Sequence, residues 1–205
     1  MRFSRPLDDV FQARSNVRVL RALDGLPAEI DSSVREIARR AGVSHPTAAS
    51  VLEGLRTQGL VVVRRTLFAD EYRLNTGHIL AKQLHSLFGG ERRAATELVD
   101  LLTEEIGSRA PWVTEATLFG SFVRSEMRPD SDIDLALICP PGKTSRLKQE
   151  MERLSEATVA RFGNPVNAVI GTGSVQEMAQ PRHRGYRLWR TFAEDGRRII
   201  PSDPD

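Results

Sequence analysis

The chain has 205 residues, 40% hydrophobic and 27% charged, with a formal net charge of +2. This length suits two domains of about 100 residues, and no apolar run reaches the ~18–20 residues that a membrane-spanning helix needs. The N-terminus has no apolar stretch followed by a small-residue cleavage site, and a single cysteine, Cys139, excludes an internal disulfide. We therefore expect a cytoplasmic protein without a membrane partner.

The charge is distributed unevenly along the chain. Residues 1–90 contain 13 Lys/Arg and 9 Asp/Glu, or +4, whereas residues 91–205 contain 16 and 18, or −2. This modest asymmetry is typical of a protein that contacts phosphates mainly through its first half.

The first elements predicted in chain order are three helices. Apolar spacing indicates a helix over residues 9–23. Ser33 and Glu36 form a capping-box pattern at the start of a short helix that Gly42 ends, and a third helix follows over residues 45–58, with Pro46 in its first turn. The two later helices are joined by a tight turn, which is typical of a helix-turn-helix.

A β-hairpin is predicted next, from residues 60–63 and 72–74. We expect its tip to be charged and to carry Arg64, Arg65, Asp70 and Glu71. A helix over residues 77–88 then leads to Gly89–Gly90, which we interpret as a linker, so that the predicted domains are 1–89 and 90–205.

The second half alternates between helices and strands. The predicted elements are a helix over 91–107, a strand over 114–119, a glycine-serine turn with a short helix, a strand over 133–138, a helix over 144–162, a strand over 166–170, helices near 174–179 and 184–194, and a strand around 197–200. The expected fold class is thus α+β with two domains: a helical winged helix-turn-helix and a mixed sheet flanked by helices.

The helix-turn-helix and the hairpin together indicate a DNA-binding surface. Its candidate residues lie at helix starts, on the outward face of the third helix and on the hairpin: Ser33, Ser44, His45, Thr47, Ser50, Arg56, Arg64 and Arg65. The stretch REIARRAGVSHPTAASVLEGLRTQGLV resembles the winged-helix regulators of the MarR and ArsR type, over roughly residues 10–88. This resemblance implies DNA binding. The outward face of the third helix is poor in the side chains that usually read bases. The alternative to DNA binding is a winged helix used for dimerisation or protein contact alone.

The second constellation is a Gly-Ser turn followed by two aspartates. A strand delivers Gly120 and Ser121 to a turn, where a phosphate can approach the backbone, and the next strand opens with Asp132 and Asp134. Residues two apart on a strand share a face, so these carboxylates predict a Mg²⁺ or Mn²⁺ site; a solvated acidic loop is the alternative.

This segment is similar to the minimal nucleotidyltransferases of the polymerase-β superfamily, over about residues 91–200. Ten residues separate Ser121 from Asp132, as in the family's signature. The resemblance implies a catalytic and metal-binding role for Asp132 and Asp134, and binding of a nucleoside triphosphate by Gly120, Ser121, Arg124 and Ser131. The family's third carboxylate corresponds here to Asn167, which cannot act as a general base near neutral pH.

Two functions follow from these features. The first is Mg²⁺-dependent transfer of a nucleoside monophosphate from a nucleoside triphosphate to a protein, RNA or small-molecule acceptor, with antitoxin-like modification of a partner among the possibilities. The alternative is a transcriptional regulator that binds nucleotide without turnover, which Asn167 favours. A homodimer is expected, because palindromic operators favour two-fold symmetry.

Overall fold

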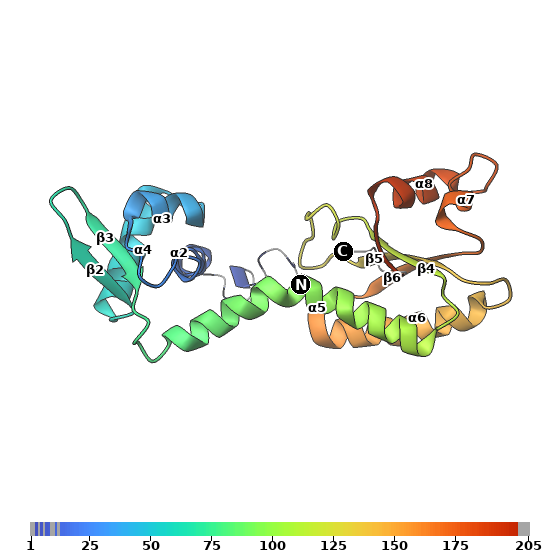
Figure 1. Cartoon of the computed structure of the whole chain (residues 1–205), viewed down its shortest axis with the longest axis horizontal. Coiled ribbons are helices and arrows are strands. Elements are labelled where there is room, and N and C mark those ends of the chain that lie inside the picture. Colours follow the sequence, from blue (N-terminus) through green and yellow to red (C-terminus); the bar gives the residue numbers. More distant parts are fainter. Residues whose placement is uncertain (1–2, 4, 6, 9–10, 12, 201–205) are drawn as a thin grey trace. The chain divides into compact units, whose positions relative to one another are not determined.

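The computed structural model describes residues 3, 5, 7, 8, 11 and 13–200 (Figure 1). It divides into two compact units, one of Arg5–Arg93 and one that joins Met1–Ser4 to Ala94–Asp205. None of the helices in the described part of the chain is long and apolar enough to cross a membrane.

The first unit is built on three helices, α2 (Arg14–Asp24), α3 (Val34–Ala41) and α4 (His45–Thr57). The predicted helix over 9–23 is present from Arg14, and residues 9, 10 and 12 lie outside the described residues. The three helices bury a shared apolar core that includes Val19, Leu23, Ile37, Ala48, Leu52 and Leu55. This core holds the two helices of the helix-turn-helix against α2.

Local chemistry explains where these helices begin and end. Ser33 caps α3 by accepting a hydrogen bond from the backbone N–H of Glu36 at 3.3 Å, while the Glu36 carboxylate accepts hydrogen bonds from Arg39 and Arg40 instead of closing the predicted capping box. Gly42 ends α3 with a left-handed φ of 63°, which a glycine adopts without steric cost.

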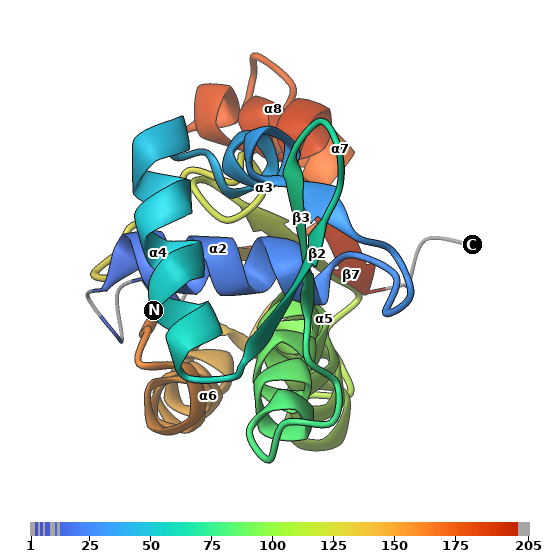
Figure 2. The same cartoon turned by 90° about the vertical axis from the view of Figure 1, so that its left-hand side faces the viewer.

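A small antiparallel sheet completes the first unit. Its order is β1 (Ser32–Ser33), β3 (Asp70–Leu74) and β2 (Val61–Arg65), so the predicted hairpin is confirmed and gains a short third strand. Figure 2 shows β2 and β3 as a two-stranded ribbon beside α4. The arrangement of three helices and a wing is the winged helix-turn-helix expected from the sequence.

Helix α5 (Ala81–Arg109) corrects the predicted linker at Gly89–Gly90, because both glycines lie inside one continuous helix. Glycine costs about 1 kcal/mol in a helix interior. Buried apolar residues on both sides of the pair, among them Phe88 and Leu98, offset this cost by packing. The helix also begins later than predicted, since residues 75–80 form turns. The domain limits 1–89 and 90–205 stay a prediction.

The second unit is a four-stranded mixed sheet of order β6-β5-β4-β7, made of β4 (Glu115–Phe119), β5 (Ile133–Ile138), β6 (Val166–Gly171) and β7 (Arg197–Ile200). Strand β5 is parallel to β6 and antiparallel to β4. One face packs against α6 (Thr144–Phe162) and the second half of α5, and the other against α7 (Val175–Met178) and α8 (Tyr186–Asp195) (Figure 1). The α+β class is thus confirmed.

The connection after β4 differs from its prediction. Residues 121–125 form turns and not a short helix. Ser125 has a φ of +57°, the one positive value at a non-glycine residue in the described ranges, and this left-handed conformation is incompatible with a continuing helix. The turn therefore leads the chain directly toward β5.

Candidate functional site

The Gly-Ser turn of the second unit packs directly on Asp134. Phe119, the last residue of β4, pairs with Asp134 on β5, and Gly120 follows with a φ of +72°. A Cβ atom on Gly120 would overlap the Asp134 carboxylate oxygen and lie 3.1 Å from its Cγ. The close approach of turn and carboxylate therefore requires glycine at position 120.

Asp132 and Asp134 stand on either side of a deeply buried residue. Ile133 is fully buried in the core beneath α5 and α6, whereas Asp132 is exposed and Asp134 half-buried. Asp132 directly precedes β5, and the alternation of strand residues gives Asp134 the same face as Ala136, which packs with α8. The signature aspartates thus belong to the face of the sheet opposite to α6.

Asn167 occupies the position that the sequence predicts for the third carboxylate. It pairs with Asp134 in the parallel ladder of β5 and β6, and its amide Nδ2 donates a hydrogen bond of 3.0 Å to Asp134 Oδ1. In the described part of the chain, no three His, Cys, Asp or Glu side chains lie together as a metal site. The oxygen donors at this end of the sheet are two carboxylates and one amide.

Three other predicted residues of this site make local contacts within the loop. Arg124 is exposed and forms an ion pair of 2.9 Å with Glu126. Ser131 accepts a hydrogen bond of 2.9 Å from the backbone N–H of Arg128, so its hydroxyl closes the turn that precedes Asp132. Ser121 is half-buried, and its carbonyl accepts a hydrogen bond from the backbone N–H of Glu126.

Asn164 is a residue that the sequence analysis missed. Its side chain is fully buried, and its amide Nδ2 donates hydrogen bonds to the carbonyls of Ser131 at 2.7 Å and Pro129 at 3.4 Å. It therefore ties the loop before Asp132 to the end of α6. The Asn-Pro pair at 164–165 signals a turn in the sequence, but the partner of the amide lies 33 residues away and has no local signature.

A basic cluster lies just before and at the start of α8. Arg182, Arg184 and Arg187 are exposed. Trp189, which follows them, packs so closely that a Cβ on Gly171 would lie 2.6 Å from its ring, and Gly171 pairs with Ile138 at the opposite end of β5 from Asp134. The start of α8 therefore covers the far end of these strands.

In the first unit, several of the predicted DNA-binding residues already have hydrogen-bond or ion-pair partners within the protein. Ser44 caps α4 and its hydroxyl lies 2.7 Å from that of Thr47. Arg56 donates to Glu53, which lowers the pKa of that carboxyl and raises the pKa of the guanidinium. His45 and Ser50 are exposed on α4.

The acidic partners extend to the neighbouring helix and the wing. Hydrogen bonds from Arg39 and then Arg40 lower the pKa of Glu36 to about 2, so this carboxylate is ionised at neutral pH. Arg64 pairs with Glu71 and, at 2.7 Å, with Asp31, while Arg65 is exposed. Several cationic side chains near this surface are therefore paired with carboxylates of the same unit.

The tip of the wing also differs from its prediction. Arg64, Arg65, Asp70 and Glu71 lie within β2 and β3, so they flank the tip instead of forming it. The tip itself is Thr66–Ala69, and Leu67 and Phe68 are 98% and 96% exposed. An apolar pair therefore stands where a charged tip was expected.

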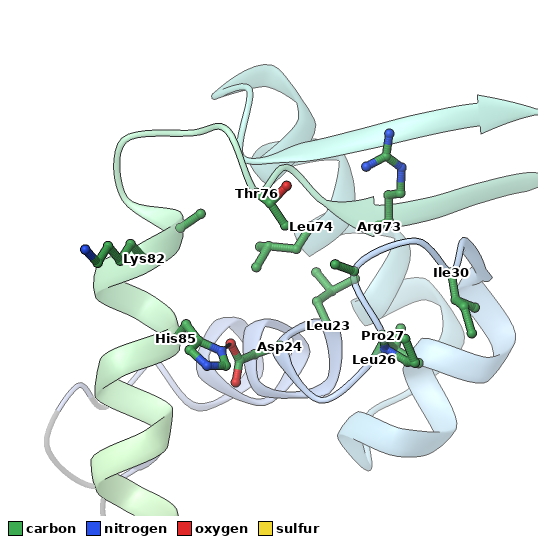
Figure 3. A pocket seen from close by; sticks show the side chains of 12 residues that line it. Leu23, Asp24, Leu26, Pro27, Ile30, Arg73, Leu74, Thr76, Lys82 and His85 are labelled. Atoms are coloured by element: carbon green, nitrogen blue, oxygen red, sulfur yellow. Dashed lines mark hydrogen bonds and ion pairs between the residues drawn. The ribbon is translucent and has the colours of Figure 1, made fainter.

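A pocket of about 300 Å³ lies between α2, β3 and the start of α5 (Figure 3). Its walls are mainly apolar and include Leu23, Leu26 and Leu74. The Asp24 carboxylate, 1% exposed, accepts hydrogen bonds of 2.9 Å from His85 and Arg92. These pairs anchor α5 to the end of α2 within the first unit.

Comparisons with known proteins agree with both parts of this description. Residues 13–66 match the MarR family, and residues 99–171 match the nucleotidyltransferase domain family. No curated protein matches the chain.

A solved structure titled "PigF with SAH" is 18% identical, with a TM-score of 0.25. The alignment covers 86% of this chain, which spans 62% of the length of that structure. The family matches coincide with the helix-turn-helix and with the sheet that carries the Gly-Ser turn. The chain thus combines a MarR-family winged helix-turn-helix with a nucleotidyltransferase domain of the polymerase-β type.

Proposed function

We propose that the second unit binds a nucleoside triphosphate and transfers its nucleoside monophosphate to an acceptor, while the first unit binds DNA. The observation that carries the first part is the packing of the Gly120–Ser121 turn on Asp134, with Asp132 directly before the first residue of β5. Because Gly120 has no side chain, a phosphate can approach the backbone of this turn next to two carboxylates.

Mg²⁺ or Mn²⁺ suits the donors of this site. Asp132 and Asp134 would hold the ion, because hard cations prefer carboxylate oxygens, and the Asn167 side chain is a weaker oxygen donor beside them. When bound, such an ion would neutralise part of the negative charge of the phosphates. The Ser121 hydroxyl and the exposed guanidinium of Arg124 would bind phosphate oxygens, Arg124 after exchanging its pairing with Glu126.

A second candidate function is nucleotide binding without turnover, and one observation favours it. Asn167 donates a hydrogen bond toward Asp134 at the position where a third carboxylate would accept a proton from the attacking hydroxyl. An amide cannot accept that proton. In this case the domain would act as a nucleotide-responsive part of a transcriptional regulator.

Calorimetry with each of the four ribonucleoside triphosphates tests the shared nucleotide-binding step. We expect heat that requires Mg²⁺ and that Asp132→Ala abolishes. Asp130→Ala is the matched control, because Asp130 is an exposed carboxylate two residues earlier that has no part in the proposed site. The absence of metal-dependent heat for all four nucleotides would contradict both candidate functions.

Labelled nucleotide separates the two candidates. The protein is incubated with cell lysate and the triphosphate that binds, labelled in its α-phosphate. Label that becomes attached to a protein or RNA with wild type, and is lost with Asp132→Ala, identifies a transferase and its acceptor class. Nucleotide that binds without transfer identifies the sensor.

For the first unit, the proposed partner is duplex DNA, contacted by α4 and the wing. A gel shift of the upstream intergenic DNA should weaken as salt rises, because phosphate contacts release counterions. Ser50→Glu on the exposed face of α4 should weaken the shift by like-charge repulsion, whereas Gln83→Glu on the exposed face of α5 adds the same charge off this face and should not. A homodimer, checked by sedimentation, remains part of this proposal.

A further inference from the structure

The most exposed apolar side chains of the described residues are adjacent and lie at the wing tip. Leu67 and Phe68 are 98% and 96% exposed, whereas the next large apolar side chain, Ile79, is 81% exposed. Two large apolar residues held fully in solvent, side by side, are unusual for a surface that contacts water alone.

The tip is a structured turn. The Thr66 hydroxyl donates to the carbonyl of Ala69 at 2.6 Å and accepts from the backbone N–H groups of Phe68 and Ala69, at 3.3 and 3.1 Å. The backbone N–H of Thr66 also donates to the carbonyl of Ala69. The backbone that carries Leu67 and Phe68 is therefore held in a hydrogen-bonded turn.

The strands of the wing have tertiary contacts as well. Asp31 binds Arg64 of β2 at 2.7 Å and Arg73 of β3 at 3.3 Å, and the buried Tyr72 packs into the core of the first unit. Strand β1 adds two residues to the edge of β3. The β2–β3 hairpin, held along both strands, extends its tip away from the helices of the first unit (Figure 1).

We infer that Leu67 and Phe68 form an apolar wedge that enters the minor groove of duplex DNA and partly unstacks a base step. This inference rests on the proposed DNA binding by the first unit. Leu and Phe are among the side chains that insert between base steps, and only the two-residue tip has to enter a groove about 6 Å wide. The exposed Arg65 precedes the tip and can contact the phosphates beside it.

The size of the apolar tip favours this occupant over another protein. Two such side chains expose on the order of 300–400 Å². A stable protein interface buries about 800 Å² on each partner, and the strands that flank the tip carry exposed charges such as Arg65 and Asp70. A base step, in contrast, is covered by one or two side chains.

The wedge also explains how the first unit can select a sequence. The exposed face of α4 offers His45 and Ser50, while Ser44 and Thr47 bind each other and Arg56 binds Glu53. Direct reading of base edges is thus limited. A wedge favours flexible pyrimidine–purine steps, which unstack at lower cost than A-tracts. The protein would then recognise how easily a DNA sequence is deformed.

Two synthetic duplexes of about 30 base pairs test the inference on the full-length protein. One carries repeated TA and CA steps with 2-aminopurine at a TA step, and the other carries A-tracts without such steps. Wild type should bind the first duplex at least about fivefold more tightly and increase its 2-aminopurine fluorescence. The double variant Leu67→Ser/Phe68→Ser should bind both duplexes equally, without the fluorescence increase.

The control is Ile79→Ser/Leu80→Ser, which removes two exposed apolar side chains outside the wing and should retain the preference. Thermal melts verify that both double variants fold.

If wild type binds both duplexes equally, or if the tip variant keeps the preference and the fluorescence increase, the proposed wedge is wrong while DNA binding stands. If wild type binds neither duplex, the proposed DNA binding fails too. Loss of self-association in the tip variant, with unchanged DNA binding, would assign the tip to a protein contact and overturn the inference.

Discussion

The Asn167 amide donates a hydrogen bond to Asp134 Oδ1 across 3.0 Å, from the neighbouring strand of a parallel ladder. This contact places a hydrogen-bond donor, which carries no negative charge, beside one of the two signature carboxylates. It satisfies one lone pair of Asp134 and avoids the repulsion that a third carboxylate would create there. If the attacking hydroxyl loses its proton at this position, as proposed above, the amide of Asn167 cannot accept it.

The first prediction concerns Asn167→Asp. In EDTA this variant should be less stable than wild type by about 1–2 kcal/mol, because it loses a hydrogen bond and brings two carboxylates together. About 10 mM Mg²⁺ should raise its melting temperature more than that of wild type, since an ion that binds the native state stabilises it. Asn167→Ala, which removes the donor without adding charge, should show no such gain.

Labelled-nucleotide transfer extends this experiment. If turnover by wild type is limited by the missing base, Asn167→Asp should raise the rate by roughly 10²-fold, the usual contribution of a general base. Equal Mg²⁺ responses of the aspartate and alanine variants would show that position 167 does not face the metal.

The second prediction compares Gly120→Ala with Gly142→Ala. Both glycines have left-handed backbones, with φ of +72° and +84°, so each alanine should cost about 1–2 kcal/mol of folding free energy, measured by denaturant unfolding. Only Gly120→Ala meets the Asp134 carboxylate, whereas a Cβ on Gly142 has nothing within 4 Å.

The two variants should differ in nucleotide binding. The Asp134 side chain must rotate away from an alanine at 120, so the Mg²⁺–triphosphate affinity of Gly120→Ala should fall at least about tenfold, while that of Gly142→Ala should be unchanged. Calorimetry measures both. Normal affinity in Gly120→Ala would refute the assignment of this turn to the nucleotide site.

The third prediction concerns Ser125, whose φ of +57° is unfavourable for any residue with a Cβ atom. Ser125→Gly should stabilise the protein by about 0.5–1 kcal/mol, because glycine adopts this conformation without the steric penalty but loses more entropy on folding. Ser125→Ala keeps the penalty and is the control. Denaturant midpoints that shift equally in both variants would show that the backbone conformation is not the cause.

The fourth prediction concerns acid stability and Asp8. Burial alone would raise the pKa of this carboxyl, but hydrogen bonds from Arg21 and Arg18 outweigh burial and hold its pKa below the ordinary value of 3.8. The Asp8 side chain is fully buried, and Arg21 also binds Glu91. A lowered folded-state pKa contributes stability that is present above the unfolded value and is lost as pH falls through the folded one.

Asp8→Asn should therefore destabilise the first unit by about 2–4 kcal/mol at neutral pH, since the partly buried Arg18 and Arg21 lose the charge of a buried carboxylate partner. Its unfolding free energy should then decline less than that of wild type between about pH 4 and pH 2. Denaturant unfolding across this range measures the difference, with Asp100→Asn, an exposed carboxylate on α5, as the control. Parallel declines in wild type and Asp8→Asn would contradict the linkage.

Much of the fold could be predicted because its signals are local. The caps at Ser33 and Ser44, the left-handed Gly42 and the alternating strands of the second unit each depend on a few adjacent residues. The register that brings Asn167 beside Asp134 could also be anticipated, since parallel neighbours in a mixed sheet align their ends.

The features that were missed depend on distant partners. Gly89–Gly90 has the local signature of a linker, and only packing on both sides keeps it helical. The partner of Asn164 lies in another loop, 33 residues earlier in the chain. The length of β2 and β3 depends on the pairing between them, which has no local signature. Because the strands were predicted too short, the four charged residues that pair within them were assigned to the tip.

Cys139 is 1% exposed at the end of β5 and is the single cysteine of the chain. A thiol reagent added to the native protein therefore finds no accessible native target. A cysteine introduced at the surface, for example Leu67→Cys, becomes the one position that a maleimide dye can reach. Site-specific fluorescent labelling of this protein therefore does not require replacement of the native cysteine.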